Sequence, residues 1–336
     1  MRKTSLSNLL LFFTLILCLQ ACKPKQSLPN ALDDYSERMY KVLSLDPSDI
    51  NVNSTLSFPS KTSLILDIPP LNIKVREFYA IENCAIKQLI AERNTALGKT
   101  QLPSVRLQYE WALIEMLKNC LQQDVNIENR PLFVKMTQWL HQKENLFPLN
   151  WANMITQSDE FYLSLSASAG FIEGSENDNF TQGLYDLKNL IAIKENPQQQ
   201  LSTIESSLQS IQNHRIYARQ WRSQKLLAGY LNMMTDDIST WANTFNCDTR
   251  KNKEKIKIVR NVFTLFFIQQ IQAIASQINH YHYLLKPEFL TLSEDIHLPE
   301  DIKEVIDYYT NEGFSAYQES ILNHVKMWQQ IFEKCE

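Results

Sequence analysis

The side chains best suited to covalent chemistry in this sequence are its six cysteines, because a thiol can be oxidised, alkylated or bound to a metal. Cys18 and Cys22 lie near the N-terminus, and the other four are spread along the chain at Cys84, Cys120, Cys247 and Cys335. Four cysteines can pair in three ways, and an even number is typical of disulfides in an oxidising compartment. Their chemistry therefore depends on the compartment that the chain reaches.

The N-terminal segment has the organisation of a secretory signal peptide. Arg2 and Lys3 are positively charged, and an apolar run from Leu9 to Leu19 follows them. This run is too short to span a bilayer permanently. It leads into Leu19-Gln20-Ala21-Cys22, which resembles the lipobox of bacterial lipoproteins, whose cysteine is lipidated and becomes the first residue of the mature protein.

The resemblance to a lipobox implies an address in the cell envelope. We expect residues 1–21 to be removed as a signal peptide and residues 22–27 to form a short tether. Acyl chains on Cys22 would anchor the protein in a lipid bilayer. Lys23 is not the aspartate that resembles an inner-membrane retention signal, so outer-membrane sorting is implied, with the protein facing the periplasm. Because this compartment oxidises thiols, disulfides are expected among the remaining cysteines.

The charge balance argues against nucleic acid as a partner. Removing Arg2 and Lys3 from the 33 Lys+Arg leaves 31 against 37 Asp+Glu, a net charge of about −6. A general nucleic-acid binder needs a cationic surface that displaces counterions from phosphate. The basic run at residues 250–257 is interpreted as a solvated face, with anionic lipid or an acidic protein as the alternative contact.

The composition favours helices. Six Gly and 12 Pro in 336 residues is a low content of helix breakers, which indicates a mostly α fold built as a helical bundle. A short extended segment is expected near residues 62–70. The polar stretch 173–179 is the best boundary between an N-terminal half, residues 28–172, and a C-terminal half, residues 173–336, although both could form one continuous domain.

A helical hairpin is expected in the N-terminal half. Its first helix would run from Glu77 to Leu97, Gly98 would provide a C-cap with positive φ, and Pro103 would open the second helix. At about 1.5 Å per residue, Cys84 and Cys120 lie roughly 20 Å and 24 Å from the turn, so they can face each other. Of the three pairings we therefore prefer Cys84 with Cys120 and Cys247 with Cys335.

Three helices are expected in the C-terminal half. Apolar residues from Leu201 to Trp221 repeat at three and four residues, which predicts one long helix with a coiled-coil-like seam. Asn261–Tyr281 has no formal charge, but its four glutamines make it a poor transmembrane span, so we predict a central helix buried by its neighbours. The last helix places Cys335 on its packed side.

Two groups of polar residues are candidate binding residues. His324 lies on the apolar face of the last helix, four residues before Trp328, while Glu92, Arg93 and Asn94 end the first helix of the hairpin. For His324 we favour a core histidine bonded to a neighbour, and for the charged cluster a helix-end salt bridge with capping. A pocket that uses both groups is the alternative.

No motif for catalysis, a cofactor or a metal stands out. The sequence lacks a G-x-S-x-G elbow, an H-E-x-x-H pair and a phosphate-binding P-loop. His280 and His282 point about 200° apart on a helix, so they cannot bind one ion without other ligands. We expect no catalytic residue, no cofactor and no metal.

Five stretches spread over most of the mature chain indicate a relationship to other proteins. They are Leu32-x-x-Tyr35-x-x-Arg38, Cys84-x-x-x-x-Leu89-Ile90-Ala91-Glu92-Arg93-Asn94-x-x-Leu97-Gly98-Lys99, Pro103-Ser104-x-x-Leu107-x-Tyr109-Glu110, Arg260-Asn261-Val262-Phe263 and His324-Val325-x-x-Trp328-Gln329. Together they resemble a family of lipoproteins from gram-negative bacteria known as domain of unknown function 3080. The resemblance implies a helical lipoprotein with these cysteines and implies no known activity.

Two functional hypotheses follow. The first is a non-catalytic, membrane-anchored lipoprotein that binds a protein or another envelope component through a helical surface. The second is an envelope hydrolase or a small-ligand carrier with a pocket near His324, Trp328 and Glu92-Arg93. We favour the first, because no nucleophile, metal or phosphate motif supports the second.

Overall fold

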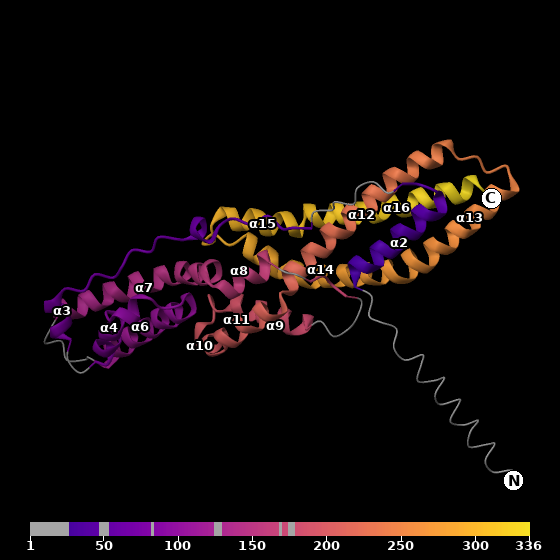
Figure 1. Ribbon diagram of the computed structural model, residues 1–336. Coiled ribbons are helices and arrows are strands. Elements are labelled where there is room, and N and C mark those ends of the chain that lie inside the picture. The colour runs from indigo at the N-terminus through magenta and orange to yellow at the C-terminus, as the bar shows by residue number, and fades with distance from the viewer. Residues whose placement is uncertain (1–26, 47–53, 82–83, 124–129, 168–169, 174–178) are drawn as a thin grey trace, which may run out of the picture.

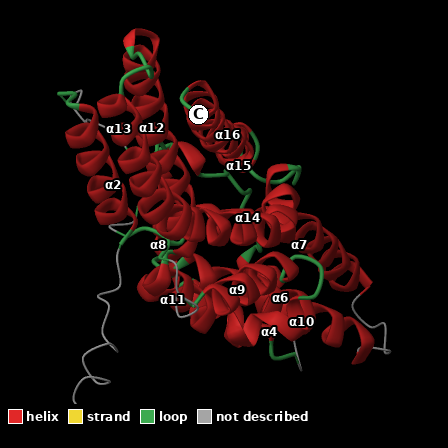
Figure 2. Cartoon of the chain, turned by 90° about the vertical axis from the view of Figure 1, so that its right-hand side faces the viewer, coloured by secondary structure: helices red, strands yellow, loops and turns green. Residues whose placement is uncertain are grey.

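The computed structural model describes residues 27–46, 54–81, 84–123, 130–167, 170–173 and 179–336, and every regular element among them is a helix (Figure 2). The predicted mostly α fold is therefore confirmed. The signal peptide, Cys22 and residues 22–26 of the tether lie outside the described residues.

The molecule is elongated, with helices grouped towards its two ends (Figure 1). One end is formed by α3 (Val75–Ala80), α4 (Ile86–Arg93), α5 (Ala96–Lys99), α6 (Pro103–Gln123) and the first part of α7 (Arg130–Gln157). The other end is formed by α2 (Leu28–Leu43), α12 (Ile216–Thr244), α13 (Arg250–Val262) and α16 (Glu312–Lys334).

Shorter helices connect the two ends. They are η1 (Lys61–Leu64), α8 (Asp159–Ser166), α9 (Phe180–Ala192), α10 (Pro197–Gln200), η2 (Leu201–Thr203), α11 (Ile204–His214) and α15 (Glu300–Thr310). Beside them runs a continuous helical stretch made of α13, the π-helical segment η3 (Phe263–Ile271) and α14 (Gln272–Ser293).

The main hydrophobic core takes side chains from both predicted halves of the chain. Helix α2 begins at a Ser27 cap and buries one apolar face among α12, η3 and α16. Two tyrosine–aspartate hydrogen bonds join α2 to α12: Tyr40 donates to Asp237 at 2.7 Å and Tyr230 donates to Asp33 at 2.5 Å. The N-terminal helix is therefore part of the C-terminal bundle, while the division into halves at residue 173 stays a prediction.

A smaller core lies at the other end of the molecule. Its buried members are Ile81, which follows α3, and residues of α4, α6 and α7 that include Ile90, Leu117 and Trp139. Cys84 and Cys120 form a disulfide beside it, with Cα atoms 5.7 Å apart. The second disulfide, Cys247–Cys335, ties the C-terminus to the segment before α13. Both predicted pairings are confirmed.

The first helix of the predicted hairpin is not continuous, so the expectation for Glu77–Leu97 was wrong. The chain leaves α3 at Ala80, re-enters a helix at Ile86 and ends it at Arg93. Side chains after Arg93 account for the end of α4, because Asn94 donates to the Ile90 carbonyl and Thr95 donates to the Glu92 carbonyl. Such local bonds compete with helix propagation.

Gly98 has a different role from the predicted C-cap. No described glycine has positive φ. A Cβ atom on Gly98 would lie 2.3 Å from the Glu92 carbonyl oxygen and 2.7 Å from that of Arg93. Glycine is required there because α5 packs directly against the end of α4.

The long helix predicted from Leu201 to Trp221 is also interrupted. Arg215 adopts a left-handed conformation with φ 45°, and this residue separates α11 from α12. Its guanidinium donates to the carbonyls of Gln212 and Ala167, which holds the turn in place. The apolar spacing continued across the break, so the periodicity alone did not reveal it.

The uncharged stretch Asn261–Tyr281 is buried on one side only, which corrects the expectation of a helix covered by its neighbours. Phe267, Ile271 and Ile278 pack into the main core, whereas Leu265 is 48% exposed. By length and composition, the helical stretch Arg250–Ser293 is the one candidate for a membrane span among the described residues, a test that core helices of soluble proteins also pass. Its packed face assigns it to the core of this fold.

The expected extended segment near 62–70 crosses α7 without forming a strand. Residues 61–64 form the 3₁₀ helix η1, and the following residues are irregular. Leu66 donates its N–H to the Asn153 side chain at 2.9 Å, and Asn153 donates to the Leu66 carbonyl at 2.8 Å. The amide of Asn153 thus replaces a neighbouring strand as the hydrogen-bond partner.

Candidate functional site

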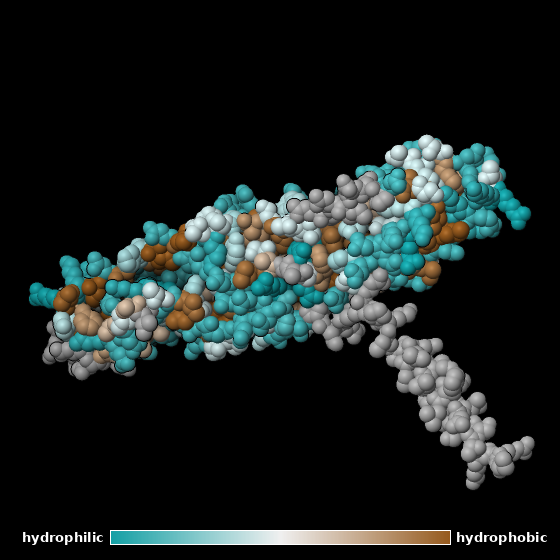
Figure 3. Space-filling view, in the orientation of Figure 1, coloured by the Kyte–Doolittle hydropathy of each residue, from teal (hydrophilic) through white to brown (hydrophobic). Residues whose placement is uncertain are grey.

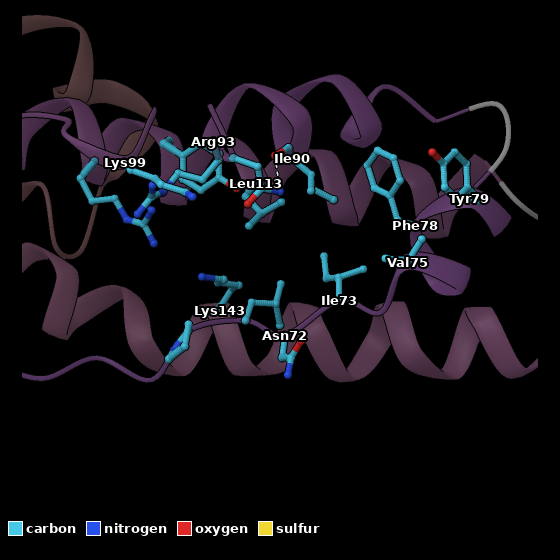
Figure 4. A pocket seen from close by; sticks show the side chains of 15 residues that line it. Asn72, Ile73, Val75, Phe78, Tyr79, Ile90, Arg93, Lys99, Leu113 and Lys143 are labelled. Atoms are coloured by element: carbon cyan, nitrogen blue, oxygen red, sulfur yellow. Dashed lines mark hydrogen bonds between the residues drawn. The ribbon is translucent and has the colours of Figure 1, made fainter. Parts of the chain in front are cut away.

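A hollow of about 560 Å³ opens over the smaller core. Asn72 and Ile73 of the irregular segment lie on the same side of the hollow as Lys143 of α7, and Ile90, Arg93 and Leu113 of α4 and α6 lie on the opposite side (Figure 4). We call this hollow the cationic pocket.

The charges of the cationic pocket are strongly unbalanced. Its 15 lining residues include Arg93, Lys99, Arg106 and Lys143, and none of the 15 is acidic. Arg93 is at the end of α4, Lys99 ends α5, Arg106 is in the first turn of α6 and Lys143 comes from the middle of α7. Four separate helices therefore bring positive charge to one place.

Only one carboxylate compensates these cations within the described residues. Glu110 is 1% exposed, and its Oε2 lies 2.7 Å from Nζ of Lys143, which is 3% exposed. The other oxygen of Glu110 pairs with Arg106 on the same helix. The charge of Lys143 is thus neutralised by a buried ion pair. Glu110 makes no ion pair with Arg93 or Lys99.

Two buried N–H groups in the cationic pocket have no hydrogen-bond partner among the described residues. They are Nε of Arg93 and Nη1 of Arg106. Another nitrogen of Arg93, Nη1, donates to the Gly98 carbonyl, which holds the guanidinium over α5. A buried donor without an acceptor costs about 1–3 kcal/mol, more for a charged group. Both arginines also line the hollow, so their side chains are the nearest unsatisfied donors to a bound anion.

The far end of the cationic pocket is apolar. Ile73, Val75, Phe78 and Tyr79 lie on the side away from Arg93 and Lys99 (Figure 4). Val75 is 72% exposed and Tyr79 is 69% exposed, so both stand at the rim rather than in the core. Figure 3 shows hydrophobic residues on the surface at this end of the molecule. The pocket therefore has one charged and one apolar end.

Tyr109 adds a neutral hydroxyl to the lining. Burial and the neighbouring Glu110 charge raise its pKa to about 12, against a smaller opposing effect of Arg106. The Arg106 guanidinium lies 5.1 Å from the centre of the Tyr109 ring, within range of a cation–π contact. Tyr109 consequently keeps its proton at physiological pH and helps to orient Arg106.

A second hollow of about 380 Å³ shares Arg93, Lys99 and Arg106 with the first. Its other walls include Ile65, Ile68 and Met154, along with the amides of Asn150 and Asn153. The shared cations consequently stand between two hollows with partly apolar walls.

The candidate residues from the hairpin have different positions. Arg93 and Asn94 line the cationic pocket, whereas the Glu92 carboxylate is exposed and accepts a hydrogen bond from Gln88 at 3.0 Å. Sequence reasoning missed Lys99, Arg106, Tyr109 and Lys143. The i, i+4 spacing of Arg106 and Glu110 was a visible signal of an ion pair. The sequence spacing gave no sign that Lys143 would lie beside Arg106 and Glu110.

His324 and Trp328 lie in the main core and do not face a hollow. Both are 0% exposed. Their partner is Tyr35 of α2, whose hydroxyl lies 2.8 Å from His324 Nε2 and 3.0 Å from Trp328 Nε1. The structure thus places these two residues in a different core from Arg93, and the pocket that would have used both groups does not form.

The hydrogen bonds of His324 define its protonation state. Thr235 donates its hydroxyl proton to the Leu231 carbonyl, so its oxygen accepts from His324 Nδ1–H at 2.9 Å. Nε2 is then the acceptor for Tyr35 and Trp328. Burial lowers the pKa of His324 to about 3, which agrees with a neutral ring. His324 is therefore hydrogen-bonded as the core-histidine interpretation expected.

His280 and His282, the two histidines that lie two residues apart, are on different sides of α14. His282 is buried with its ring stacked on Phe314 at 3.4 Å between centres, and burial followed by the Lys286 charge lowers its pKa to about 4. His280 is exposed on the opposite side of α14. Among the described residues, no three potential metal ligands come together.

Comparison with known proteins gives one match. Residues 32–336 match the family described as "Protein of unknown function (DUF3080)". No curated protein and no solved structure matches the chain.

Proposed function

The chain belongs to the DUF3080 family, which has no assigned activity, and from this starting point we propose that it is a membrane-anchored lipoprotein of the cell envelope that binds an anionic envelope component. In this proposal it faces the periplasm from the outer membrane, and its role is binding and not catalysis. The cationic pocket is the binding site.

The observation that supports a binding role is the surplus of positive charge in the cationic pocket. Four cations from four helices meet there, and one buried carboxylate balances only part of their charge. Holding like charges together without a ligand is unfavourable, and the fold nevertheless positions them with a buried ion pair and a backbone hydrogen bond. Such preorganisation is typical of a site built for an anion.

The lipid anchor is supported by the sequence. Arg2, Lys3 and the apolar run precede Leu19-Gln20-Ala21-Cys22, and α2 begins at Leu28. Five residues separate Cys22 from Leu28, a span of at most roughly 20 Å. An acylated Cys22 would therefore hold the helical body close to the bilayer surface.

Retention of a native ligand tests the binding role. Full-length protein extracted from membranes with mild detergent is compared with the variant Arg93→Gln/Arg106→Gln, and the small molecules released by each are identified by mass spectrometry. We expect an anionic compound in the wild-type sample that is absent from the variant. Arg250→Gln/Lys251→Gln removes two charges from α13 and serves as the control. The same compounds in all three samples would contradict a role for the pocket.

The anchor is tested on the intact chain. We expect the mass of the N-terminal peptide to show Cys22 with acyl chains, and Cys22→Ser to move the protein from the membrane fraction to the soluble fraction. An unmodified thiol at position 22 in the membrane fraction would contradict anchoring, whether or not the pocket binds an anion.

A further inference from the structure

We infer that the cationic pocket recognises an anionic amphiphile that carries a phosphate group: the phosphate binds between Arg93 and Arg106, and an apolar chain extends towards Val75 and Tyr79. This inference rests on the proposed function, because it names the ligand class of the same pocket. The inference adds that the ligand has a phosphate head group and an apolar hydrocarbon chain.

The number of charges favours phosphate over a single carboxylate. Arg93, Lys99, Arg106 and Lys143 contribute four positive charges, and Glu110 removes one. A surplus of three is matched better by a phosphate monoester, with a charge of −1.5 to −2 near neutral pH, than by one carboxylate. Planar guanidiniums also suit phosphate, since each can donate two parallel hydrogen bonds to its oxygens.

The unused donors mark where the head group binds. Nε of Arg93 and Nη1 of Arg106 are buried and lack acceptors among the described residues. The two side chains come from different helices, and both line the two adjoining hollows. A phosphate has enough oxygens to accept from both guanidiniums and still accept from Lys99, whose side chain is exposed at the same place.

The apolar end of the pocket is the reason for proposing that the ligand carries a hydrocarbon chain. A site for a free inorganic anion would need polar groups all round it, but Ile73, Val75, Phe78 and Tyr79 form the other end (Figure 4). Val75 and Tyr79 leave most of their surface in water. Covering such residues with a hydrocarbon chain is favourable in proportion to the area removed from water. A ligand with both an anionic head and an apolar chain satisfies both ends.

Binding of defined probes to the full-length protein tests the inference. Calorimetry compares dodecyl phosphate below its micelle concentration with inorganic phosphate and with dodecyl maltoside, which has the same chain and an uncharged head. We expect dodecyl phosphate to bind at least about tenfold more tightly than either, because each lost charge-assisted hydrogen bond or buried chain corresponds to about a factor of ten. Equal affinity for dodecyl phosphate and dodecyl maltoside would overturn the inference, and equal affinity for dodecyl and inorganic phosphate would also overturn it.

Variants show whether the binding occurs in this pocket. Arg93→Gln/Arg106→Gln should weaken dodecyl phosphate binding by about tenfold or more, and Lys99→Gln, which changes only an exposed side chain, by about threefold. Arg250→Gln/Lys251→Gln should leave the affinity unchanged. Circular dichroism confirms that each variant is folded. Loss of affinity in the α13 control equal to that in the pocket variants would overturn the assignment to this site.

Vesicles distinguish two sources of the ligand. Binding of the Cys22→Ser protein to vesicles that contain phosphatidic acid, whose head group is a phosphate monoester, but not to vesicles of phosphatidylcholine alone, abolished by Arg93→Gln/Arg106→Gln, would identify a membrane lipid. Binding to monomeric dodecyl phosphate without binding to either vesicle would identify a free amphiphile, and each result supports the inference. If membrane-extracted protein retains an anion without phosphate that the pocket variant lacks, the inference fails while the proposed function stands.

Discussion

At the scale of single residues, partly or fully buried polar side chains occur in two arrangements, one fully hydrogen-bonded and one with unused donors. His324 is enclosed by Tyr35, Thr235 and Trp328, and each of its ring nitrogens has a partner. Arg93 and Arg106 are held at a hollow with donors unused. The first arrangement stabilises the fold, and the second leaves capacity for a ligand.

The neutral His324 makes stability depend on pH. Its pKa of about 3 in the folded protein is below the ordinary value of 6.5. Above pH 6.5 neither state is protonated and the full stability is present; as the pH falls from 6.5 towards 3, the unfolded chain takes up a proton and the folded chain does not. We expect a loss of about 2 kcal/mol from this residue between pH 7 and pH 5, measured by urea unfolding.

His324→Gln separates this effect from general acid sensitivity. The variant should be less stable at pH 7, because a core hydrogen bond is altered, but its loss between pH 7 and pH 5 should be about 2 kcal/mol smaller than that of the wild type. His282, with a pKa of about 4, contributes in the same direction and remains in both proteins. An unchanged pH dependence would contradict the assignment to His324.

The buried Glu110 leads to a second prediction. Glu110→Gln leaves Lys143 charged and almost completely buried, so the free energy of unfolding should fall by about 3–5 kcal/mol. Glu115→Gln on the same helix is the matched control, since Glu115 meets Lys118 at the surface at 3.5 Å and should contribute less than about 1 kcal/mol. Chemical denaturation of both variants measures the difference. Equal losses would mean that the buried pair has no special role.

The sequence identified Arg93, His324 and Trp328 as notable but could not assign their roles. His324 and Arg93 stood out for the same reason, a polar residue within a helical apolar pattern. What distinguishes them is the partner, and Tyr35 is 289 residues from His324. Contacts over such a separation leave no trace in local spacing, and the same applies to Lys143 and Glu110.

At the scale of elements, the helices and their faces were predicted better than their ends. Apolar spacing found α16, because one face of this helix is buried throughout. The breaks in the stretches 77–97 and 201–221 were missed. The end of α4 at Arg93 is accompanied by side-chain bonds at Asn94 and Thr95, and the break within 201–221 comes from the left-handed Arg215; these features do not disturb the apolar spacing.

The two disulfides support separate groups of helices, which gives a third prediction. In the chain-entropy model, Cys84–Cys120 closes 36 residues and contributes about 4 kcal/mol. Cys84→Ser/Cys120→Ser should speed amide hydrogen exchange in α4 and α6 and weaken anion binding, since Arg93 and Arg106 lie on these helices. Cys247→Ser/Cys335→Ser should speed exchange in α12 and α16 instead. Identical exchange patterns in the two double variants would show that the whole bundle opens as one unit.

At the scale of the whole molecule, α6 and α7 contribute side chains to both cores: Leu107 and Ile114 of α6 belong to the main core, and Leu113 and Leu117 to the smaller one. Met136 and Trp139 near the start of α7 belong to the smaller core, while Trp151 and Ile155 near its end belong to the main core. Figure 1 shows α7 running from the end that carries α3 towards the middle. The cationic pocket is therefore attached to the main bundle through α6 and α7, at the opposite end from α2.

The position of α2 predicts how fragments behave. Residues 28–172 expressed alone should contain α2 without α12 and α16, and residues 173–336 alone should expose the surface that α2 covers. We expect neither fragment to give a cooperative thermal transition by circular dichroism, and we expect co-expression to restore one. A cooperative transition for the isolated fragment 173–336 would show that its core is complete without α2.

The hydrogen bonds between Tyr35 and α16 also have a consequence for how the protein is made. Helix α2 leaves the ribosome near the start of synthesis, whereas His324 and Trp328 are among the last residues added. Earlier in synthesis α12, α13 and η3 can cover part of the apolar face of α2, but the buried Tyr35 hydroxyl has neither of these partners. The main core is therefore completed only when most of α16 has been synthesised, and incomplete chains leave part of this core exposed to aggregation.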